Sequence, residues 1–158
     1  MSDPPAGPAE ADDLHRPFRP RLARIVAWSV AGAFLAFMTA LALLLPSVGV
    51  ELGTGDRIGF IGFGLLVAWF LSRQATVRAD PDATGLVVRN LLITRRVSWA
   101  EIVSVRFGQG RPWVQLDLAD GDTLAVMGVQ AADGAAAAVE ASRLATLVAL
   151  HSTTERDD

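Results

Sequence analysis

Two long uncharged apolar stretches dominate the hydrophobic pattern of the first half of the chain. They run over Ile25–Leu45 and Ile58–Ser72, and arginines flank both. At about 1.5 Å per residue, a helix over the first stretch is long enough to cross the roughly 30 Å hydrocarbon core of a bilayer. The second stretch is shorter, and its length also suits a buried helix of a soluble domain. The glycine-rich connection, Pro46–Arg57, favours a second membrane span over a buried helix. The pattern therefore predicts a transmembrane helical hairpin.

This predicted hairpin covers residues 21–73, with spans of about 25–45 and 57–73. Small residues recur four apart on both spans, which lets helix backbones approach closely in lipid. The spacing serves packing within the hairpin or a homo-oligomer through the glycine and alanine faces of the spans, and both alternatives stay open. The residues concerned are Gly32, Ala36 and Ala40 in the first span, and Gly55, Gly59, Gly64 and Ala68 in the second.

The distribution of arginine predicts the orientation of the hairpin. Four arginines precede the first span and two follow the second, whereas the connection holds only Arg57, beside Glu51 and Asp56. Positive charge collects on the cytoplasmic side of membrane proteins. We therefore expect a multi-pass protein of the cell membrane with both termini in the cytoplasm.

The segment before the hairpin is rich in proline and acidic residues and poor in large apolar ones. Such a composition cannot bury enough apolar surface to order the backbone, so residues 1–20 are predicted to be a disordered tail. A second tail is predicted at residues 152–158. The first apolar stretch is longer than the h-region of a signal peptide, about 7–15 residues, and a second stretch follows it, which favours a retained span over a cleaved signal.

The pattern changes to period two beyond Ala75. Apolar and polar residues alternate over Val114–Leu118, and Val103, Val105 and Phe107 are expected on one strand face. Asp120-Gly121-Asp122 separates two such runs and is typical of a hairpin turn, because glycine adopts positive φ readily. A further hairpin is predicted from Gly85–Arg89 and Thr94–Trp99.

The alternation stops near Gln130, and an alanine-rich segment without proline follows it. This segment predicts a helix over Ala131–His151, with Asp133 placed to cap its start. Leu144, Leu147 and Val148 fall on one helical face and are expected to pack on the strands. Residues 75–151 therefore predict six or seven short antiparallel strands followed by one helix, and the chain as a whole an α+β protein.

This order of elements resembles a PH-like domain, a bent antiparallel β-barrel of six or seven strands capped by a C-terminal α-helix. The residues themselves resemble the small PH-like-domain membrane proteins of high-GC Gram-positive bacteria. The resemblance covers about residues 25–151 and implies this fold in a membrane setting, without an activity that carries over. Its matching segments include Val77–Asp80, Gly85–Asn90, Val97–Ile102, Trp113, Leu116–Gly121 and Val129–Gly134.

Composition narrows the possible chemistry further. The chain has no cysteine, which excludes disulfides, thiolate metal sites and cysteine nucleophiles. All 14 basic residues are arginine. Residues 73–111 contain seven arginines and three acidic residues, whereas residues 112–158 contain two arginines and eight acidic residues. The half of the domain next to the spans is therefore basic. A basic face is attracted to anionic headgroups nearby, although ordinary solvated charge gives the same count.

No constellation of residues points to catalysis. Asp117, Asp120 and Asp122 lack the spacing and terminal glutamate of an EF-hand calcium loop and are interpreted as turn residues. His15 and His151 are expected to lie apart, each without a second histidine nearby. The sequence therefore predicts no enzyme, no metal site and no cofactor, and it shows no basic and aromatic face for nucleic acid.

The sharpest candidate for a binding site is the segment from Arg89 to Arg96. It holds the apolar run Leu91, Leu92 and Ile93 between Arg89 on one side and Arg95 and Arg96 on the other. As a hairpin loop it would present an apolar tip with guanidinium groups around it to a lipid interface. As a core strand, the alternative that the pattern favours slightly, it would only pack.

Two tryptophans in the second half of the chain carry weaker signals. Trp99 is expected to be a packing anchor whose N–H finds a backbone partner. Trp113 follows Pro112 at the start of a strand and is a candidate contact for a partner protein.

The function expected from these patterns is binding. We predict a membrane-anchored, cytoplasm-facing PH-like module that acts as an adaptor or scaffold for a protein partner of unknown identity. Two alternatives stay open: a sensor of anionic lipid through Arg89, Arg95, Arg96 and the Leu91–Ile93 segment, and a purely structural membrane subunit. The adaptor role rests on analogy between folds, which do not by themselves determine function.

Overall fold

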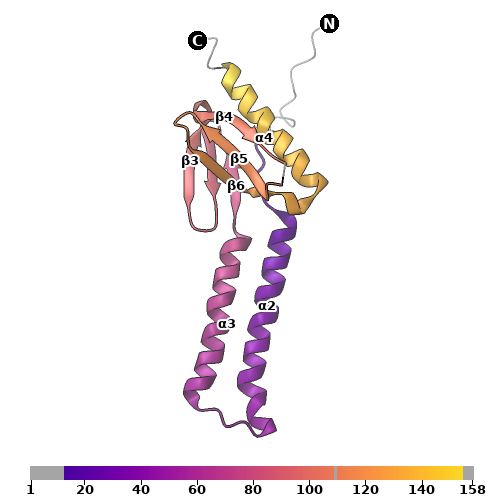
Figure 1. The fold of residues 1–158 in the computed structure, drawn as a ribbon, viewed down its shortest axis with the longest axis vertical. Coiled ribbons are helices and arrows are strands. Elements are labelled where there is room, and N and C mark those ends of the chain that lie inside the picture. The colour runs from indigo at the N-terminus through magenta and orange to yellow at the C-terminus, as the bar shows by residue number, and fades with distance from the viewer. Residues whose placement is uncertain (1–12, 109, 155–158) are drawn as a thin grey trace. The chain divides into compact units, whose positions relative to one another are not determined.

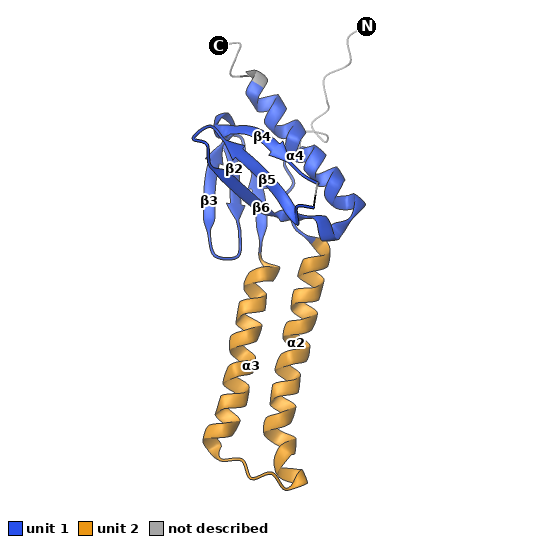
Figure 2. Ribbon diagram, viewed as in Figure 1, with its two compact units in different colours: residues 1–20, 77–158 blue, residues 21–76 orange. Residues whose placement is uncertain are grey.

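The computed structural model describes residues 13–108 and 110–154, without the side chains of 153 and 154. The chain divides into two compact units, which Figure 2 colours separately. One unit is the helical segment Arg21–Thr76, and the other joins the residues before Arg21 to Val77–Asp158. The second unit is therefore discontinuous in sequence, because the helical unit lies between its two parts.

The helical unit is a hairpin of two long helices. Helix α2 covers Arg21–Leu44, continues as a short 3-10 helix at Leu45–Val48, and is followed by α3 over Thr54–Ala75 (Figure 1). Both helices are long and apolar enough to cross a membrane. Helix α3 begins before the predicted start at residue 57, because the carboxylate of Asp56 accepts a hydrogen bond from the Gly53 N–H (2.9 Å) and caps its first turn.

The two helices pack through Gly64 of α3, as the small-residue pattern predicts, but through a face of α2 that the pattern does not predict. Ala27, Ala31, Met38 and Ala42 of α2 are buried, whereas Gly32 and Ala36 are exposed. Gly64 of α3 provides the close approach, since a Cβ at this position would lie 3.1 Å from both Leu35 Cδ1 and Met38 Cβ. The predicted role of Gly32 and Ala36 within the hairpin is thus wrong: large side chains of α2 fill a notch in α3.

Six strands in the other unit form two antiparallel sheets. The first sheet has the order β1-β2-β3 and the second β4-β5-β6 (Figure 1). The strands are β1 (Arg78–Pro81), β2 (Gly85–Arg89), β3 (Thr94–Ser98), β4 (Ile102–Arg106), β5 (Trp113–Leu118) and β6 (Thr123–Gln130). Both predicted hairpins are present, β2–β3 and β5–β6, with Gly121 at a φ of 88° in the second turn.

The structure has two separate three-stranded sheets where the sequence predicts one bent, nearly closed barrel. A 3-10 turn over Trp99–Glu101 ends β3 and redirects the chain, so no hydrogen-bonded ladder joins the described residues of the two sheets there. On the other side β6 approaches β1 without forming a ladder: a Cβ on Gly128 would lie 2.9 Å from the backbone nitrogen of Ala79. The α+β class is confirmed, but its β part is a pair of packed three-stranded sheets.

A bulge alters the predicted face of β4. The register of β4 with β5 shifts between Ile102 and Ser104, which turns the side chain of Val103 away from the core. Val103 is accordingly 67% exposed, whereas Val105 and Phe107 pack against the buried core. The prediction that these three residues share a buried face fails at Val103.

The C-terminal helix α4 covers Ala135–Thr154 and packs its apolar face on the sheets. Leu144, Leu147 and Val148 are buried as predicted. The helix begins four residues later than predicted, because Ala131–Asp133 form a 3-10 turn ended by Gly134 at positive φ. Its last residues overlap the predicted tail at 152–158, of which 155–158 lie outside the described residues.

Residues 13–20, which we name the N-terminal strap, belong to the folded domain. Phe18 is fully buried in the core of the sheets and pairs with Ala79 of β1 through two backbone hydrogen bonds of 2.8 and 3.0 Å. The prediction of a disordered tail is therefore wrong for residues 13–20, since a partner strand far along the chain orders a segment that its composition leaves unstructured. Residues 1–12 of that tail lie outside the described part of the chain.

Candidate functional site

Helix α4 holds the N-terminal strap through one arginine. The guanidinium of Arg143 donates hydrogen bonds to the carbonyl oxygens of Asp13, Leu14 and Arg16, at 3.3, 2.6 and 2.8 Å. Its carbon Cζ also lies 3.7 Å from the centroid of the Phe18 ring, a cation–π geometry. Glu140 also forms an ion pair with this guanidinium. Arg143 therefore has a structural role, and its charge is not free to bind a ligand.

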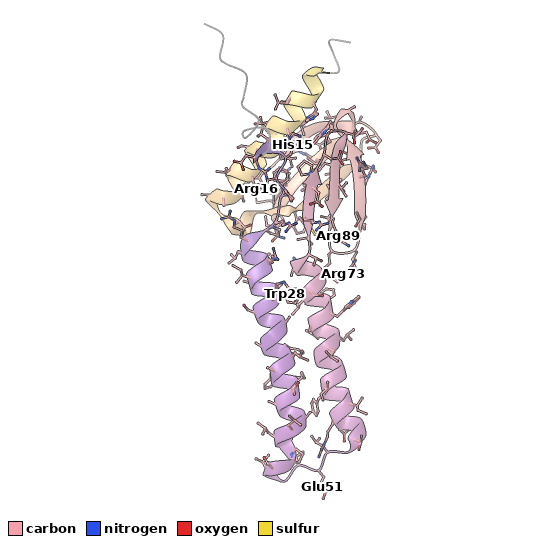
Figure 3. The ribbon with its side chains drawn as sticks, turned by 180° about the vertical axis from the view of Figure 1, so that it is seen from behind. His15, Arg16, Trp28, Glu51, Arg73 and Arg89 are labelled. Atoms are coloured by element: carbon pink, nitrogen blue, oxygen red, sulfur yellow. The ribbon has the colours of Figure 1, made fainter. Side chains whose placement is uncertain are left out.

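The two histidines meet at this contact, contrary to the expectation that they lie apart. The ring of His151 stacks on Trp99 with centroids 4.7 Å apart, and the ring of His15 meets His151 edge-on at 6.0 Å. His15 and Arg16 therefore lie along α4 (Figure 3), where Arg16 pairs with Glu140 at 3.3 Å. Trp99 is 4% exposed and donates its indole N–H to the carbonyl of Asp82 (3.0 Å), which confirms its packing role.

The segment singled out by the sequence forms the loop between β2 and β3. This β2–β3 loop comprises Asn90–Ile93 and is closed by a hydrogen bond from the Asn90 N–H to the Ile93 carbonyl (2.9 Å). The Asn90 side chain also donates to the carbonyl of Ala125 (2.7 Å) and accepts from the N–H of Met127 (3.1 Å). One side chain thus fixes the base of the loop to strand β6 of the other sheet.

The tip of this loop is apolar and faces solvent. Leu92 is 82% exposed and Ile93 is 66% exposed, while Leu91 is half-buried. Among the large apolar residues exposed in the described part of the chain, Leu92 has the largest exposed fraction. The alternative in which this run passes through a core strand is wrong, because the β2–β3 register ends at the pair Arg89 and Thr94.

The three arginines around the loop differ in their partners. Arg95 contacts Asp120 (3.2 Å) and Asp122 (3.4 Å), and Arg96 contacts Asp82 (2.7 Å). Arg89, at the end of β2 (Figure 3), is exposed, and no acidic side chain in residues 13–108 and 110–154 forms an ion pair with it. The predicted ring of three free guanidinium groups is therefore reduced to one.

Asp82 organises the turn between β1 and β2. Its carboxylate accepts hydrogen bonds from the N–H and the hydroxyl of Thr84, both at 2.8 Å, and from the N–H of Gly85 at 3.0 Å. These hydrogen bonds to Thr84, followed by the charge of Arg96, hold the pKa of Asp82 below its usual value. The aspartate is a structural turn residue.

Two further carboxylates are lowered in pKa by local hydrogen bonds. Ser98 donates its N–H (2.6 Å) and its hydroxyl (2.8 Å) to Glu101, which lowers the pKa of Glu101. The hydroxyl of Ser104 lowers the pKa of Asp117, and the guanidinium of Arg106 adds to the effect. Asp117 thereby ties β5 to β4, and the β5–β6 turn is shaped by the Asp122 N–H donating to Asp120 (2.9 Å). These contacts support turn and cross-strand roles for the aspartates.

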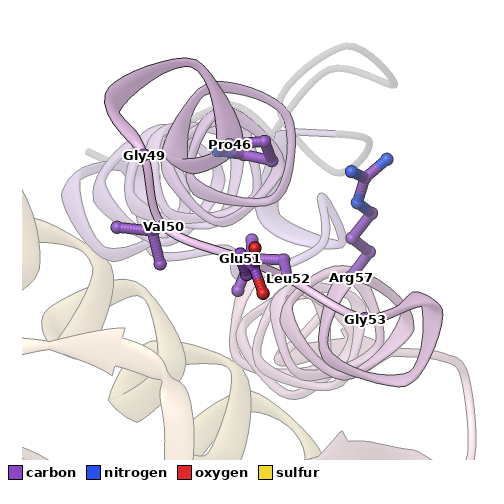
Figure 4. A pocket seen from close by; sticks show the side chains of 7 residues that line it. All are labelled: Pro46, Gly49, Val50, Glu51, Leu52, Gly53 and Arg57. Carbon is purple, nitrogen blue, oxygen red and sulfur yellow. The ribbon is translucent and has the colours of Figure 1, made fainter.

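The remaining candidates are less distinctive. Trp113 is half-buried at the start of β5, opposite Gln130, and its role as a partner contact stays a prediction. A shallow hollow lies in the connection of the helical unit, with Glu51 and Arg57 as its charged residues (Figure 4). In the described chain no three histidine, aspartate or glutamate side chains gather as a metal site would require. Nothing in the described geometry points to catalysis.

Comparisons with known proteins agree with the fold. The model of the family described as bacterial PH domain matches residues 74–146. Uncharacterized proteins of Mycobacterium bovis and of two Mycobacterium tuberculosis strains are 36% identical to the chain over 129 residues, covering 81% of this chain and 82% of theirs. No solved structure matches. The chain therefore belongs to the bacterial PH domain family, as its sequence resemblance to PH-like proteins of high-GC bacteria indicates.

Proposed function

We propose that this chain is a two-span protein of the cell membrane that holds a PH-like binding module in the cytoplasm. The observation that carries the proposal is the pairing of Phe18 with Ala79. Phe18 precedes α2 and Ala79 follows α3, yet they share one core. Segments on opposite sides of a bilayer would be at least about 30 Å apart, so this pairing requires either two spans or none.

The surface of the helical hairpin favours two spans. Large apolar side chains are exposed on both helices, an arrangement that costs free energy in water and none in lipid. A cleaved signal peptide is a poor alternative, because its removal would take Phe18 out of the core of the domain. The exposed apolar residues include Trp28, Phe37 and Leu43 on α2, and Phe63, Leu66, Trp69 and Phe70 on α3.

The charge distribution supports a cytoplasmic domain. Four arginines lie before or in the first turn of α2 and two lie at or just beyond the end of α3, whereas the connection between the helices holds Arg57 with Glu51 and Asp56. By the positive-inside rule, the side with more arginine is cytoplasmic. The domain then works there by binding, without catalysis. An adaptor role for a protein partner and a homo-oligomer through the spans stay predictions.

Cysteine labelling in intact cells tests this topology, because the chain has no native cysteine. Val50→Cys in the connection should react with a membrane-impermeant maleimide from outside. Val103→Cys on β4, where the native side chain is 67% exposed, should react only after the cells are opened. Labelling of Val103→Cys in intact cells would reverse the orientation, and recovery of the chain in the soluble fraction would refute both spans.

A further inference from the structure

We infer that the β2–β3 loop is a bilayer-contact site, with Leu92 and Ile93 entering the headgroup region and Arg89 binding anionic headgroups. The inference rests on the proposed function, since it requires a membrane beside the domain. It narrows the ligand of the module from an unspecified partner to the surface of an anionic bilayer.

The first argument is the place of the loop within the domain. Strand β2 runs antiparallel to β1, and Arg89 lies opposite Arg78, the first residue of β1. The loop therefore projects from the end of the sheet at which the chain enters β1, three residues after α3 ends at Ala75. Because three residues span at most about 11 Å, this end of the sheet stays near the end of α3.

The strap adds a second attachment at the same end. It pairs with β1 in antiparallel orientation at Phe18 and Ala79, so its chain leaves the domain toward α2 from the end at which β1 begins. Both covalent connections to the predicted spans and the tip of the loop thus share one end of the domain. A domain tied to a bilayer at two points of one end must keep that end near the headgroups.

The second argument is the chemistry of the tip. Leu92 and Ile93 are exposed neighbours on a loop whose base Asn90 fixes to β6, so the apolar pair is held outside the core. In the interface of a bilayer these two side chains leave water, as the apolar face of an interfacial helix does. Leu92 and Ile93 alone could contact any apolar surface, so they do not distinguish a bilayer from a protein.

The charge of Arg89 selects among such surfaces. Arg95 and Arg96 are matched with carboxylates, whereas the guanidinium of Arg89 has no acidic partner in the described chain. An unmatched guanidinium beside an apolar tip complements phosphate, which it binds through two N–H groups. A protein partner would need an apolar pocket with an acidic rim to bind this loop. No other feature of the described chain indicates such a partner.

The test uses the full chain in lipid vesicles, with single cysteines carrying an environment-sensitive fluorophore. Lipids with nitroxide-labelled headgroups or upper acyl chains quench a fluorophore that touches the interface. Leu92→Cys and Ile93→Cys should be quenched in vesicles containing about one third phosphatidylglycerol. Val103→Cys, as exposed as Ile93 but beyond the opposite end of β3, is the control and should stay unquenched.

The role of charge is tested by two substitutions that remove the same charge. Arg89→Gln should lower the ratio of Leu92 probes in contact with anionic vesicles to probes out of contact about fivefold, the value of one arginine at such a surface. Arg96→Gln, at a residue already paired with Asp82, should have a much smaller effect. Raising the salt concentration should weaken contact in the native chain and change little in Arg89→Gln.

The outcomes separate this inference from the topology. A Leu92 probe as unquenched as Val103 overturns the contact site, and equal quenching in neutral and anionic vesicles overturns the role of Arg89. A probe at Leu66→Cys near the middle of α3 should be quenched in every vesicle by lipids with nitroxides deep in the acyl chains; if it is not, the two-span topology itself fails. An unquenched Leu92 probe that is protected from maleimide in native membranes would assign the loop to a protein partner.

Discussion

The N-terminal strap and the β2–β3 loop are short segments that both combine an apolar side chain with an arginine nearby. In the strap contact these groups are buried or paired, and in the loop they are exposed. The strap buries Phe18 completely and matches the adjacent Arg143 with three carbonyl oxygens and Glu140. The loop exposes Leu92 and leaves Arg89 without an acidic partner in the described chain. The difference teaches that apolar and cationic residues stabilise the domain in the strap, whereas in the loop they remain exposed, as the proposed contact with a bilayer requires.

Removing the Phe18 ring should have the largest effect on the domain. Phe18→Ala leaves a cavity in a fully buried site and should lower the free energy of unfolding by about 3–5 kcal/mol. Amide hydrogen exchange of β1 and β6 in the purified full chain measures this. Phe37→Ala, at an exposed position on α2, is the matched control. Equal protection in both variants would show that the strap contributes nothing to the domain.

Replacing Arg143 tests the second half of the strap contact. Arg143→Met keeps an apolar stem but removes the hydrogen bonds to the strap, and should cost about 2–3 kcal/mol of unfolding free energy. The same change at Arg89, which has no acidic partner among residues 13–108 and 110–154, should alter the unfolding free energy by less than about 0.5 kcal/mol. Exchange of the strap amides, measured by mass spectrometry, should rise in Arg143→Met alone. A similar response of both variants would erase the distinction between the two arginines.

Acid should loosen the domain through three carboxylates whose pKa values are lowered by hydrogen bonds. The folded pKa values of Asp82, Glu101 and Asp117 lie below their unfolded values. Their contribution to stability is therefore complete above the unfolded pKa of about 4, and is lost as the pH falls through the lowered folded values. Thermal unfolding between pH 7 and pH 2 should show this decline, and Asp82→Asn should make it shallower. An unchanged pH profile in that variant would contradict the assignment.

The smallest effect on stability is expected at the tip of the loop. Leu92→Ser changes a side chain that is 82% exposed and should alter the unfolding free energy by less than about 0.5 kcal/mol. Hydrogen exchange of the β2 and β3 amides measures this, under the same conditions as those used for Phe18→Ala. A loss comparable with that of Phe18→Ala would make Leu92 a core residue and remove the basis of the contact site.

The elements predicted correctly depend on local patterns. Both hairpins follow from alternation on either side of a turn, and Gly121 provides the positive φ that the β5–β6 turn requires. The buried face of α4 follows from the helical spacing of Leu144, Leu147 and Val148. The bulge at Val103 defeats the same reasoning, because one inserted residue reverses the faces of a strand without leaving a mark in the pattern.

The features missed depend on partners far along the chain. Phe18 lies in a proline-rich segment whose composition predicts disorder, and its burial depends on Ala79, which is beyond both helices. The β2–β3 loop was a candidate from its apolar run, but the choice between loop and core strand depends on Asn90 and its backbone partners in β6. The pairing of Arg95 with Asp120 and Asp122 is likewise a contact between separate hairpins.

The Phe18–Ala79 pair also sets the order of events while the chain is being made. Its two residues are about 60 positions apart, and both helices lie inside the loop that the pair closes, so the loop-closure cost falls late in folding. In the two-span topology proposed above, the strap is made first during synthesis but has no partner until α3 has been inserted and β1 has left the ribosome. In that topology the core of the domain is completed only after both helices are in place, and a chain whose insertion fails keeps Phe18 out of the core.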